Sequence, residues 1–197
     1  MDSAVLTGLG LAPSAGLNAY IPLLVLALAD RFSDRIMLER PYDFLSSNIG
    51  LAILLVLLTV EIVADKIPGV DHGNDLVQSA IRPASGAIAM MAATHAENAM
   101  NPVLAMIIGL LLAGGIHGIK AVMRPAITVS TGGFGNPIVS FIEDGFAAIT
   151  SVVAILLPAL AVALVAGFSL LLWWLYGRIR RLTAFTAGST DTQSLRR

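Results

Sequence analysis

The sequence predicts an all-α protein: a polytopic transmembrane helical bundle with kinked or broken helices and re-entrant segments. Charged residues make up 13% of its 197 residues and hydrophobic residues 56%, whereas a soluble domain carries about 25% charged residues. Four long stretches contain no acidic or basic side chain, namely 3–29, 44–60, 98–116 and 145–177. Because roughly 20 apolar residues cross the ~30 Å hydrocarbon core as a helix, we expect residues 1–182 to form one transmembrane domain.

The first apolar stretch, 3–29, is expected to form a kinked or broken helix. Pro13, Asn18 and Pro22 interrupt it, and membrane helices tolerate such residues where neighbouring groups satisfy the freed backbone. The alternative is that its small residues only let another helix pack closely. A signal peptide is not expected, because no basic residue precedes this stretch and the stretch is too long for one.

The middle of the chain is expected to hold two spans and one partial span. A polar loop over 30–43 leads to the second span, which covers about 46–61. A polar helix should follow over 70–82. The apolar run 83–94 is too short to cross as a helix, so we predict a re-entrant or half-helix there. The third full span should cover about 102–123.

The last third of the chain should contain an irregular segment and a kink. Residues 128–137 are uncharged but rich in glycine, and irregular backbone at membrane depth occurs only where protein buries it or a cavity lies beside it. The uncharged stretch 145–177 would be about 50 Å long as one helix. That is too long for one span, so we expect a kink or a hairpin near Pro158.

The C-terminal end indicates the orientation. Trp173, Trp174 and Tyr176 resemble an interfacial aromatic belt, and three arginines follow them. Because positive charge concentrates on the cytoplasmic side, we expect a disordered cytoplasmic tail over 183–197. The arginines of the 30–43 loop suggest that this loop is cytoplasmic too, which would place the N-terminus outside with about five crossings. The expected location is a bacterial cytoplasmic (inner) membrane.

A short polar pattern occurs twice, 42 positions apart. Each copy has the spacing i, i+3, i+7, which forms a single stripe on a helix, and each ends at Arg-Pro-Ala. In one interpretation both stripes are helix ends near an interface, where the proline ends the helix. In the other, repeat units at about 46–100 and 101–150 face each other across a polar site, as in many transporters. The two copies are Asp75, Gln78 and Arg82, and His117, Lys120 and Arg124.

Acidic side chains cluster in two further places. Glu61 and Asp65 share a helix face just before Lys66, and two carboxylates on one face need a cation or a proton nearby. With Asp71 and His72 they are candidate metal ligands or proton carriers, although 71 and 72 could equally lie in a solvated loop.

Glu143, Asp144 and Asn136 form the second acidic group. They are expected to complete a polar cavity or to form buried salt bridges with the basic stripe.

Several classes of function are not expected. The chain has no cysteine and a formal net charge of −1, so neither thiol chemistry nor nucleic-acid binding is predicted. No hydrolase elbow, phosphate-binding loop or zinc-protease motif occurs. We therefore expect no cofactor and no enzyme activity, with an intramembrane lipid-modifying enzyme as a minor alternative.

The motifs resemble a bacterial multi-pass membrane-protein family known only as a domain of unknown function (DUF4126-like). The segments that carry the resemblance are 14–22, 61–72, 81–84 and 132–137 with Glu143-Asp144. The resemblance implies a multi-pass membrane protein and no particular activity. Residues 61–66 are also similar to the acidic motif of manganese- and calcium-type cation/proton exchangers. However, the spacing differs, and Ile67 replaces their hydroxyl residue.

We expect a small transporter or channel for an ion or a small polar solute. The residues along its pathway would be Glu61, Asp65, Lys66, Asp75, Arg82, His117, Lys120, Arg124, Asn136, Glu143 and Asp144. The acids would bind a cation or a proton, and the arginines would gate or neutralise them. The alternative is a non-transporting scaffold subunit of a larger membrane complex. Expected partners are the lipid bilayer, the solute, and further copies or unlike membrane subunits.

Overall fold

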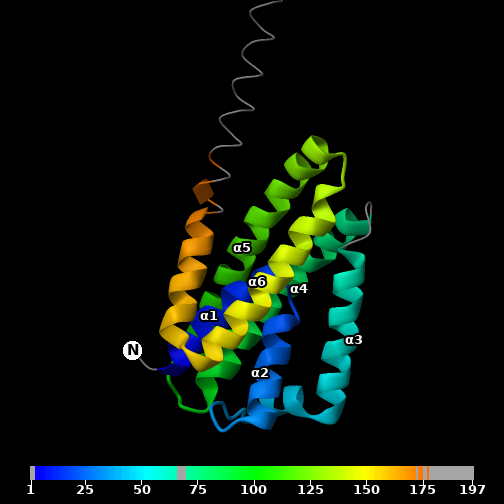
Figure 1. Cartoon of the computed structure of the whole chain (residues 1–197). Coiled ribbons are helices and arrows are strands. Elements are labelled where there is room, and N and C mark those ends of the chain that lie inside the picture. The colour runs from blue at the N-terminus through cyan, green and yellow to red at the C-terminus, as the bar shows by residue number, and fades with distance from the viewer. Residues whose placement is uncertain (1–2, 66–69, 172, 175–176, 178–197) are drawn as a thin grey trace, which may run out of the picture.

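The computed structural model describes residues 3–65, 70–171, 173–174 and 177, without the side chains of 70–75. These residues form helices, turns and loops and contain no strand, which confirms the all-α prediction (Figure 1). The predicted tail, 183–197, lies outside the described residues. The elements are α1 (Ser3–Leu17), α2 (Ile21–Phe32), η1 (Tyr42–Ser46), α3 (Asn48–Ala64), α4 (Val70–His95), α5 (Pro102–Thr131) and α6 (Gly135–Leu156). A further helical segment covers Pro158–Leu171.

The predicted break in the first apolar stretch is confirmed, and it lies at Asn18. α1 ends at Leu17 and α2 begins at Ile21. The Asn18 side-chain oxygen accepts hydrogen bonds from the backbone amides of Tyr20 and Ile21, each at 3.1 Å. Asparagine favours this role, because its short side chain satisfies amides that begin a helix. Pro13 lies inside α1 and does not break it.

The break turns the chain back on itself. Thr7 of α1 bonds Ala154 of α6, whereas Asn18 bonds Asp144, so α1 runs antiparallel to α6.

α2 runs in the same direction as α6. Ile21 packs in one cluster with Ala147, and Phe32 lies near Leu156. α1 and α2 therefore form a re-entrant hairpin whose two outer ends lie at the same end of the bundle (Figure 1).

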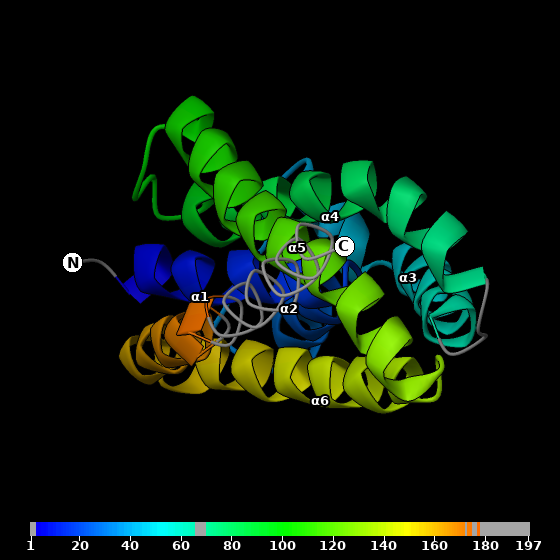
Figure 2. The same cartoon turned by 90° about the horizontal axis from the view of Figure 1, so that it is seen from above.

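α4 and α5 form an antiparallel pair with close backbone contact. A Cβ atom on Gly86 would meet the Ala113 side chain and the Gly109 carbonyl oxygen. Figure 2 shows the two helices side by side. Only residues without a large side chain allow backbones to approach this closely.

Both Arg-Pro sites lie inside continuous helices, so the prediction that proline ends each helix is wrong. Pro83 lies within α4, which has 26 residues, and Pro125 lies within α5, which has 30. A proline removes one backbone donor and bends a helix, but packing against neighbours keeps the helix continuous. The run 83–94 is consequently not a separate re-entrant segment. The chain instead reverses its direction between α1 and α2.

The predicted irregular segment at 128–137 is much shorter than expected. α5 continues to Thr131, and α6 starts at Gly135. The turn between them uses Gly132 and Gly133, whose φ angles are 62° and 90°, a region that glycine enters without steric cost. The glycines of this segment therefore make a tight turn and not an extended loop. The predicted break near Pro158 is confirmed, since α6 ends at Leu156 and helix resumes at Pro158.

The 30–43 loop and the C-terminal part of the chain lie at opposite ends of the bundle (Figure 1). The arginine-rich tail, whose side was predicted together with that of this loop, lies outside the described residues. The re-entrant hairpin returns the chain to its starting end, and five further helical segments follow: α3, α4, α5, α6 and Pro158–Leu171. An odd number of passes carries Trp173 and Trp174 to the other end.

Two helices, α5 and α6, are long and apolar enough to cross a membrane. α1, α3 and Pro158–Leu171 are apolar but shorter. Large hydrophobic side chains face outward on these helices, including Val56, Leu111 and Ile149 at 62%, 65% and 61% exposure. An outer surface of this kind agrees with membrane association.

Candidate functional site

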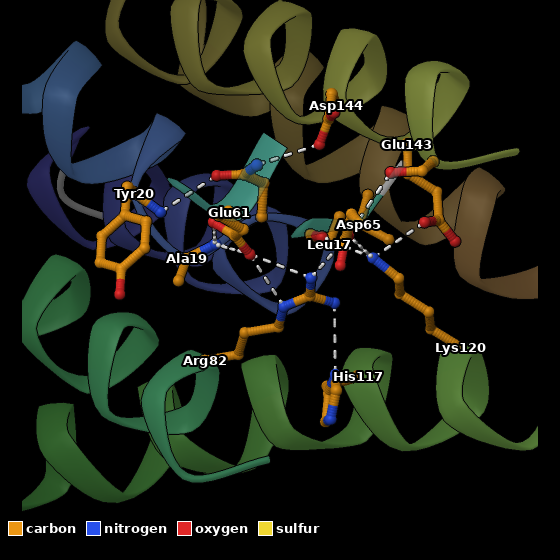
Figure 3. A network of polar contacts seen from close by, with 12 residues as sticks. Leu17, Ala19, Tyr20, Glu61, Asp65, Arg82, His117, Lys120, Glu143 and Asp144 are labelled. Atoms are coloured by element: carbon orange, nitrogen blue, oxygen red, sulfur yellow. Dashed lines mark hydrogen bonds and ion pairs between the residues drawn. The ribbon is translucent and has the colours of Figure 1, made fainter. Parts of the chain in front are cut away.

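A buried cluster of charged side chains lies where the tip of the α1–α2 hairpin meets α3, α4, α5 and α6 (Figure 3). We call this cluster the charged centre. Its acids and bases are 0–9% exposed, although charged residues are almost never fully buried unless they are paired. Its members are Glu61, Asp65, Arg82, Lys120, Arg124, Glu143 and Asp144.

Arg82 of α4 joins both carboxylates at the end of α3. Its Nη2 donates to Glu61 Oε1 at 2.9 Å and to Asp65 Oδ2 at 3.3 Å, and its Nε donates to Glu61 Oε1 at 3.2 Å. The Arg82 side chain is completely buried. The two acids stand four residues apart on one face of α3, as the sequence predicted, and this arginine relieves their mutual repulsion.

Asp65 is the most heavily shared group of the centre. Its Oδ2 atom accepts from Lys120 at 3.3 Å and from Arg124 at 3.1 Å, in addition to Arg82. Ser140 Oγ of α6 lies 3.4 Å from the same atom. The arginines that end the two repeated stripes therefore meet at a single carboxylate oxygen. This convergence is what a shared polar site between the two stripes requires.

The broken helix brings its own partial charges to the centre. The last carbonyls of a helix carry negative partial charge, and the first amides carry positive partial charge. At the end of α1, the carbonyl oxygens of Gly16 and Leu17 accept from Arg82 at 3.4 Å and Lys120 at 3.1 Å. Just before α2, the Ala19 amide donates to the Glu61 carboxylate at 3.1 Å. Each end of the break thus faces charge of the opposite sign.

Asn18 is a site residue that sequence reasoning did not select. Its Nδ2 donates to Asp144 Oδ1 at 3.0 Å, while its Oδ1 caps the start of α2. The side chain is fully buried. The signal that could have found it was an asparagine between two prolines in a stretch without charge, which needs polar partners from elsewhere in the fold.

His117 contacts Arg82 and Ser79. Arginine only donates hydrogen bonds, so in the 3.3 Å contact with Arg82 Nη1 the acceptor is His117 Nδ1. The other ring nitrogen, Nε2, lies 3.1 Å from Ser79 Oγ. On α4, one turn before Arg82, the Oε1 atom of Gln78 is buried without a hydrogen-bond partner among the described residues.

Glu143 faces the basic stripe of α5, as one of the two interpretations predicted. Lys120 Nζ lies 2.9 Å from Glu143 Oε2, and Arg124 Nη2 lies 4.0 Å from it. Asn136, near the start of α6, donates from its Nδ2 to Thr128 Oγ1 at 2.9 Å. Lys120 and Arg124 of the second stripe therefore pair with Glu143 as well as with Asp65.

The structure brings most of the predicted pathway residues together. Seven of them meet directly or through one shared partner, and they are Glu61, Asp65, Arg82, His117, Lys120, Arg124 and Glu143. Asp144 lies beside them on α6 and accepts from Asn18 at the hairpin tip. Lys66 and the side chains of Asp71, His72 and Asp75 lie outside the described part of the chain. Among the described residues, no group of three or more acids and histidines is placed to hold a metal ion. Glu61 and Asp65 pair instead with arginine and lysine.

Burying this many charges is costly unless every one is compensated. Four acids face three bases in the charged centre, and removing one partner of a buried pair costs about 3–5 kcal/mol, because the other charge stays buried. A cavity of about 430 Å³ lies where the N-terminus of α1 meets the 33–41 loop, away from the centre. The residues of the centre are 0–9% exposed, so the centre is closed to solvent in this structure.

Fold and site together define an all-helical bundle built around a buried ionic centre at a helix break. The chain belongs to the family described as "Domain of unknown function (DUF4126)", whose model matches residues 5–178. This match confirms the resemblance seen in the motifs. No curated protein and no solved structure was matched.

Proposed function

We propose that this protein is a polytopic membrane transporter or channel for an ion or a small polar solute. The observation that carries the proposal is the meeting of a helix break with a buried ionic centre inside an apolar bundle. The acids Glu61, Asp65, Glu143 and Asp144 would bind a cation or a proton in turn. Arg82, Lys120 and Arg124 would neutralise them when the site is empty.

The membrane location is supported by α5 and α6, which pass the length and composition test. α4 is long enough to cross as well, at about 39 Å for its 26 residues. The arms of the α1–α2 hairpin have 15 and 12 residues, about 22 and 18 Å, so each would reach only part of the way through a ~30 Å core. The hairpin tip, and with it the charged centre, would lie near mid-membrane.

Charge at the C-terminus supports the orientation. The arginines that follow Trp174 would place that end in the cytoplasm, for a bacterial protein the cytoplasmic face of the inner membrane. The 33–47 loop would then face the opposite side, because it lies at the other end of the bundle (Figure 1).

Transport is supported by the way the broken helix takes part in the centre. In many transporters, half-helix ends and unwound backbone coordinate the solute near the midplane. Here the carbonyls of Gly16 and Leu17 and the amide of Ala19 occupy such positions and bond to movable side chains. A cation that displaced Lys120 would find the Leu17 carbonyl and two carboxylates already in place.

A second candidate function is a scaffold subunit that packs into a larger membrane complex without transport. The closed packing of the charged centre supports it, because buried ion pairs that never open would serve only to fix helix register. In that case the purified chain should leave the membrane with unlike partners.

Flux in proteoliposomes separates the two candidates. Purified protein is reconstituted, and uptake is measured for protons and a panel of monovalent and divalent cations and anions. Glu61→Gln and Arg124→Ala are compared with wild type, and Asp43→Asn serves as the matched control, since Asp43 forms an exposed pair with Arg40 at 3.8 Å.

We expect the control to move solute like wild type and the two centre variants to lose at least about ten-fold in rate, the effect of removing about 1.4 kcal/mol of stabilisation along the path. Gel filtration and helical content establish that each variant is folded. If wild type moves no solute, or if all four proteins move it equally, the transport proposal is refuted and the scaffold remains.

A further inference from the structure

A cavity of about 430 Å³ opens at the end of the bundle where both arms of the hairpin start and finish. Its walls come from the first turns of α1, the loop after α2, and the ends of α4 and α6. The lining includes three acids, Asp34, Glu39 and Glu97, and one base, Arg35. A wall with more acids than bases raises the local concentration of cations.

A seam of buried polar side chains leads from this cavity to the charged centre along α1 and α6. Thr7 lines the cavity and donates to the Ala154 carbonyl oxygen at 3.1 Å. Two turns along α1, Ser14 Oγ lies 2.7 Å from Thr150 Oγ1. One turn further, Asn18 reaches Asp144.

Helix periodicity places the side chains of the seam on one face of each helix. On α1, Ser3 and Thr7 line the cavity, and Ser14 and Asn18 follow on the same face at i+7 and i+11 from Thr7. On α6, Ser151 lies seven residues after Asp144 and four before Ile155, which lines the cavity. Such spacings place all three on one stripe of α6.

Ser151 is the one hydroxyl of the seam without a hydrogen-bond partner among the described residues. It is fully buried. An unsatisfied buried hydroxyl costs about 1–3 kcal/mol, and a water that enters beside it would recover that cost. Along α6, Ser151 lies between Thr150, which contacts Ser14, and Ala154, which accepts from Thr7. The described hydrogen bonds leave a gap in the seam at this level.

The gap is narrow in this structure. A Cβ atom on Gly10 would stand 2.8 Å from the Ala154 Cβ and 2.9 Å from the Ala161 Cβ. A hydrated metal ion is too large for such a passage, whereas a proton needs only a chain of hydrogen-bonding groups.

We infer that the cavity is the mouth, and the Thr7–Ser151–Ser14–Thr150 seam the route, by which protons reach Asp144 and the charged centre from the 33–47 side. The inference rests on the proposed function and names its ion. Along the seam each hydroxyl accepts a proton from one side and releases its own to the other, so its charge is unchanged at the end. The transferred proton arrives at the Asp144 carboxylate beside Asn18.

Single cysteines test the route without depending on flux. The chain contains no cysteine, so Thr7→Cys and Ser151→Cys each carry the only thiol. Ala89→Cys is the buried control, at 0% exposure in an apolar cluster, and Ile149→Cys is the outward-facing control on α6, at 61% exposure. Hydrogen peroxide, a thiol oxidant little larger than water, is added to reconstituted full-length protein, and the modification of each thiol is followed over time.

We expect Thr7→Cys to react fastest, and Ser151→Cys to react at least about ten-fold faster than both controls, because opening of the seam exposes it to water. Equal rates for Ser151→Cys and Ala89→Cys would overturn the route. In parallel, Thr7→Val and Ser151→Ala should lower proton flux by about one hundred-fold, the lower end of what a positioned proton-transfer group supplies.

The two arms distinguish the failure of this inference from the failure of the proposed function. Proton flux that is unchanged in Thr7→Val and Ser151→Ala, with slow thiol modification, would overturn the route and leave transport in place. If Ser151→Cys is modified fast but the wild-type protein moves neither protons nor other ions, the proposed function is overturned. The assignment of the proton as the transported ion is then overturned with it.

Discussion

Asp65→Asn is the most informative single change, because one carboxylate oxygen serves three cations. The substitution keeps the shape of the side chain and removes its charge. Arg82, Lys120 and Arg124 then lose an anion at 3.3, 3.3 and 3.1 Å. At an effective dielectric constant of about 20, each of these pairs contributes about 5 kcal/mol before desolvation is subtracted.

The net cost is smaller than this sum but still large. The amide oxygen still accepts hydrogen bonds, and Glu61 and Glu143 still neutralise part of the charge. We therefore expect a loss of about 3–5 kcal/mol, the usual result of removing one partner from a buried pair. For a chain of this size, each kcal/mol lowers the melting temperature by about 2–4 °C, which gives a drop of about 6–20 °C.

Thermal unfolding of the reconstituted or detergent-solubilised protein measures this drop. Asp43→Asn, in the exposed pair with Arg40, is the matched control and should shift the melting temperature by less than about 4 °C, since exposed pairs contribute about 0–1 kcal/mol.

The double variant Asp65→Asn/Arg124→Gln removes one cation together with the anion and should recover part of the loss, with a coupling of about 0.5–3 kcal/mol. If Asp65→Asn behaves like the exposed control, or if the double variant shows no coupling, the description of Asp65 as the hub of the centre is refuted.

Three further predictions concern the break, the helix contact and the histidine. Asn18→Ala should cost about 1–2 kcal/mol in thermal unfolding, because the start of α2 loses its cap and Asp144 loses a donor. Gly86→Ala should cost about 1–3 kcal/mol, because its Cβ would collide with Ala113. Gly115→Ala, with nothing within 4 Å of its Cβ, should be neutral or stabilising by up to about 1 kcal/mol in the same assay. Replacing the acceptor Nδ1 in His117→Leu should cost about 1–3 kcal/mol, because Arg82 Nη1 loses a buried partner, whereas His117→Asn should recover part of it.

Sequence reasoning anticipated the helical class and most of the charged centre for a specific physical reason. Charge inside an apolar stretch needs a partner. Helical spacing showed that Glu61 shares a face with Asp65 and that Lys120 shares one with Arg124, and the repeated pattern linked Arg82 to Arg124. The structure places these five together.

The position of the re-entrant segment could not be predicted in the same way. Pro83 suggested a helix end, but whether a proline breaks or only bends a helix depends on tertiary packing. Asn18 breaks α1–α2 because Asp144 and the amides of α2 satisfy its side chain. Asp144 lies 126 residues away in the sequence, so local patterning does not reveal it.

The opposed ends of the chain escaped prediction for a related reason. Counting crossings requires knowing that 3–32 returns to its starting side, and apolar length alone does not distinguish a returning hairpin from a single long span. Only the contacts of α1 and α2 with α6 fix their directions.

The hairpin tip also has a consequence for the order of biosynthesis. Asn18 and Ala19 are synthesised before their partners Asp144 and Glu61, which follow 126 and 42 residues later. Until α6 has been synthesised, the tip contains amides, carbonyls and an asparagine without their native partners, which is costly in an apolar medium. The native contacts of the hairpin tip can therefore form only late in synthesis, after the helices that surround it have been made.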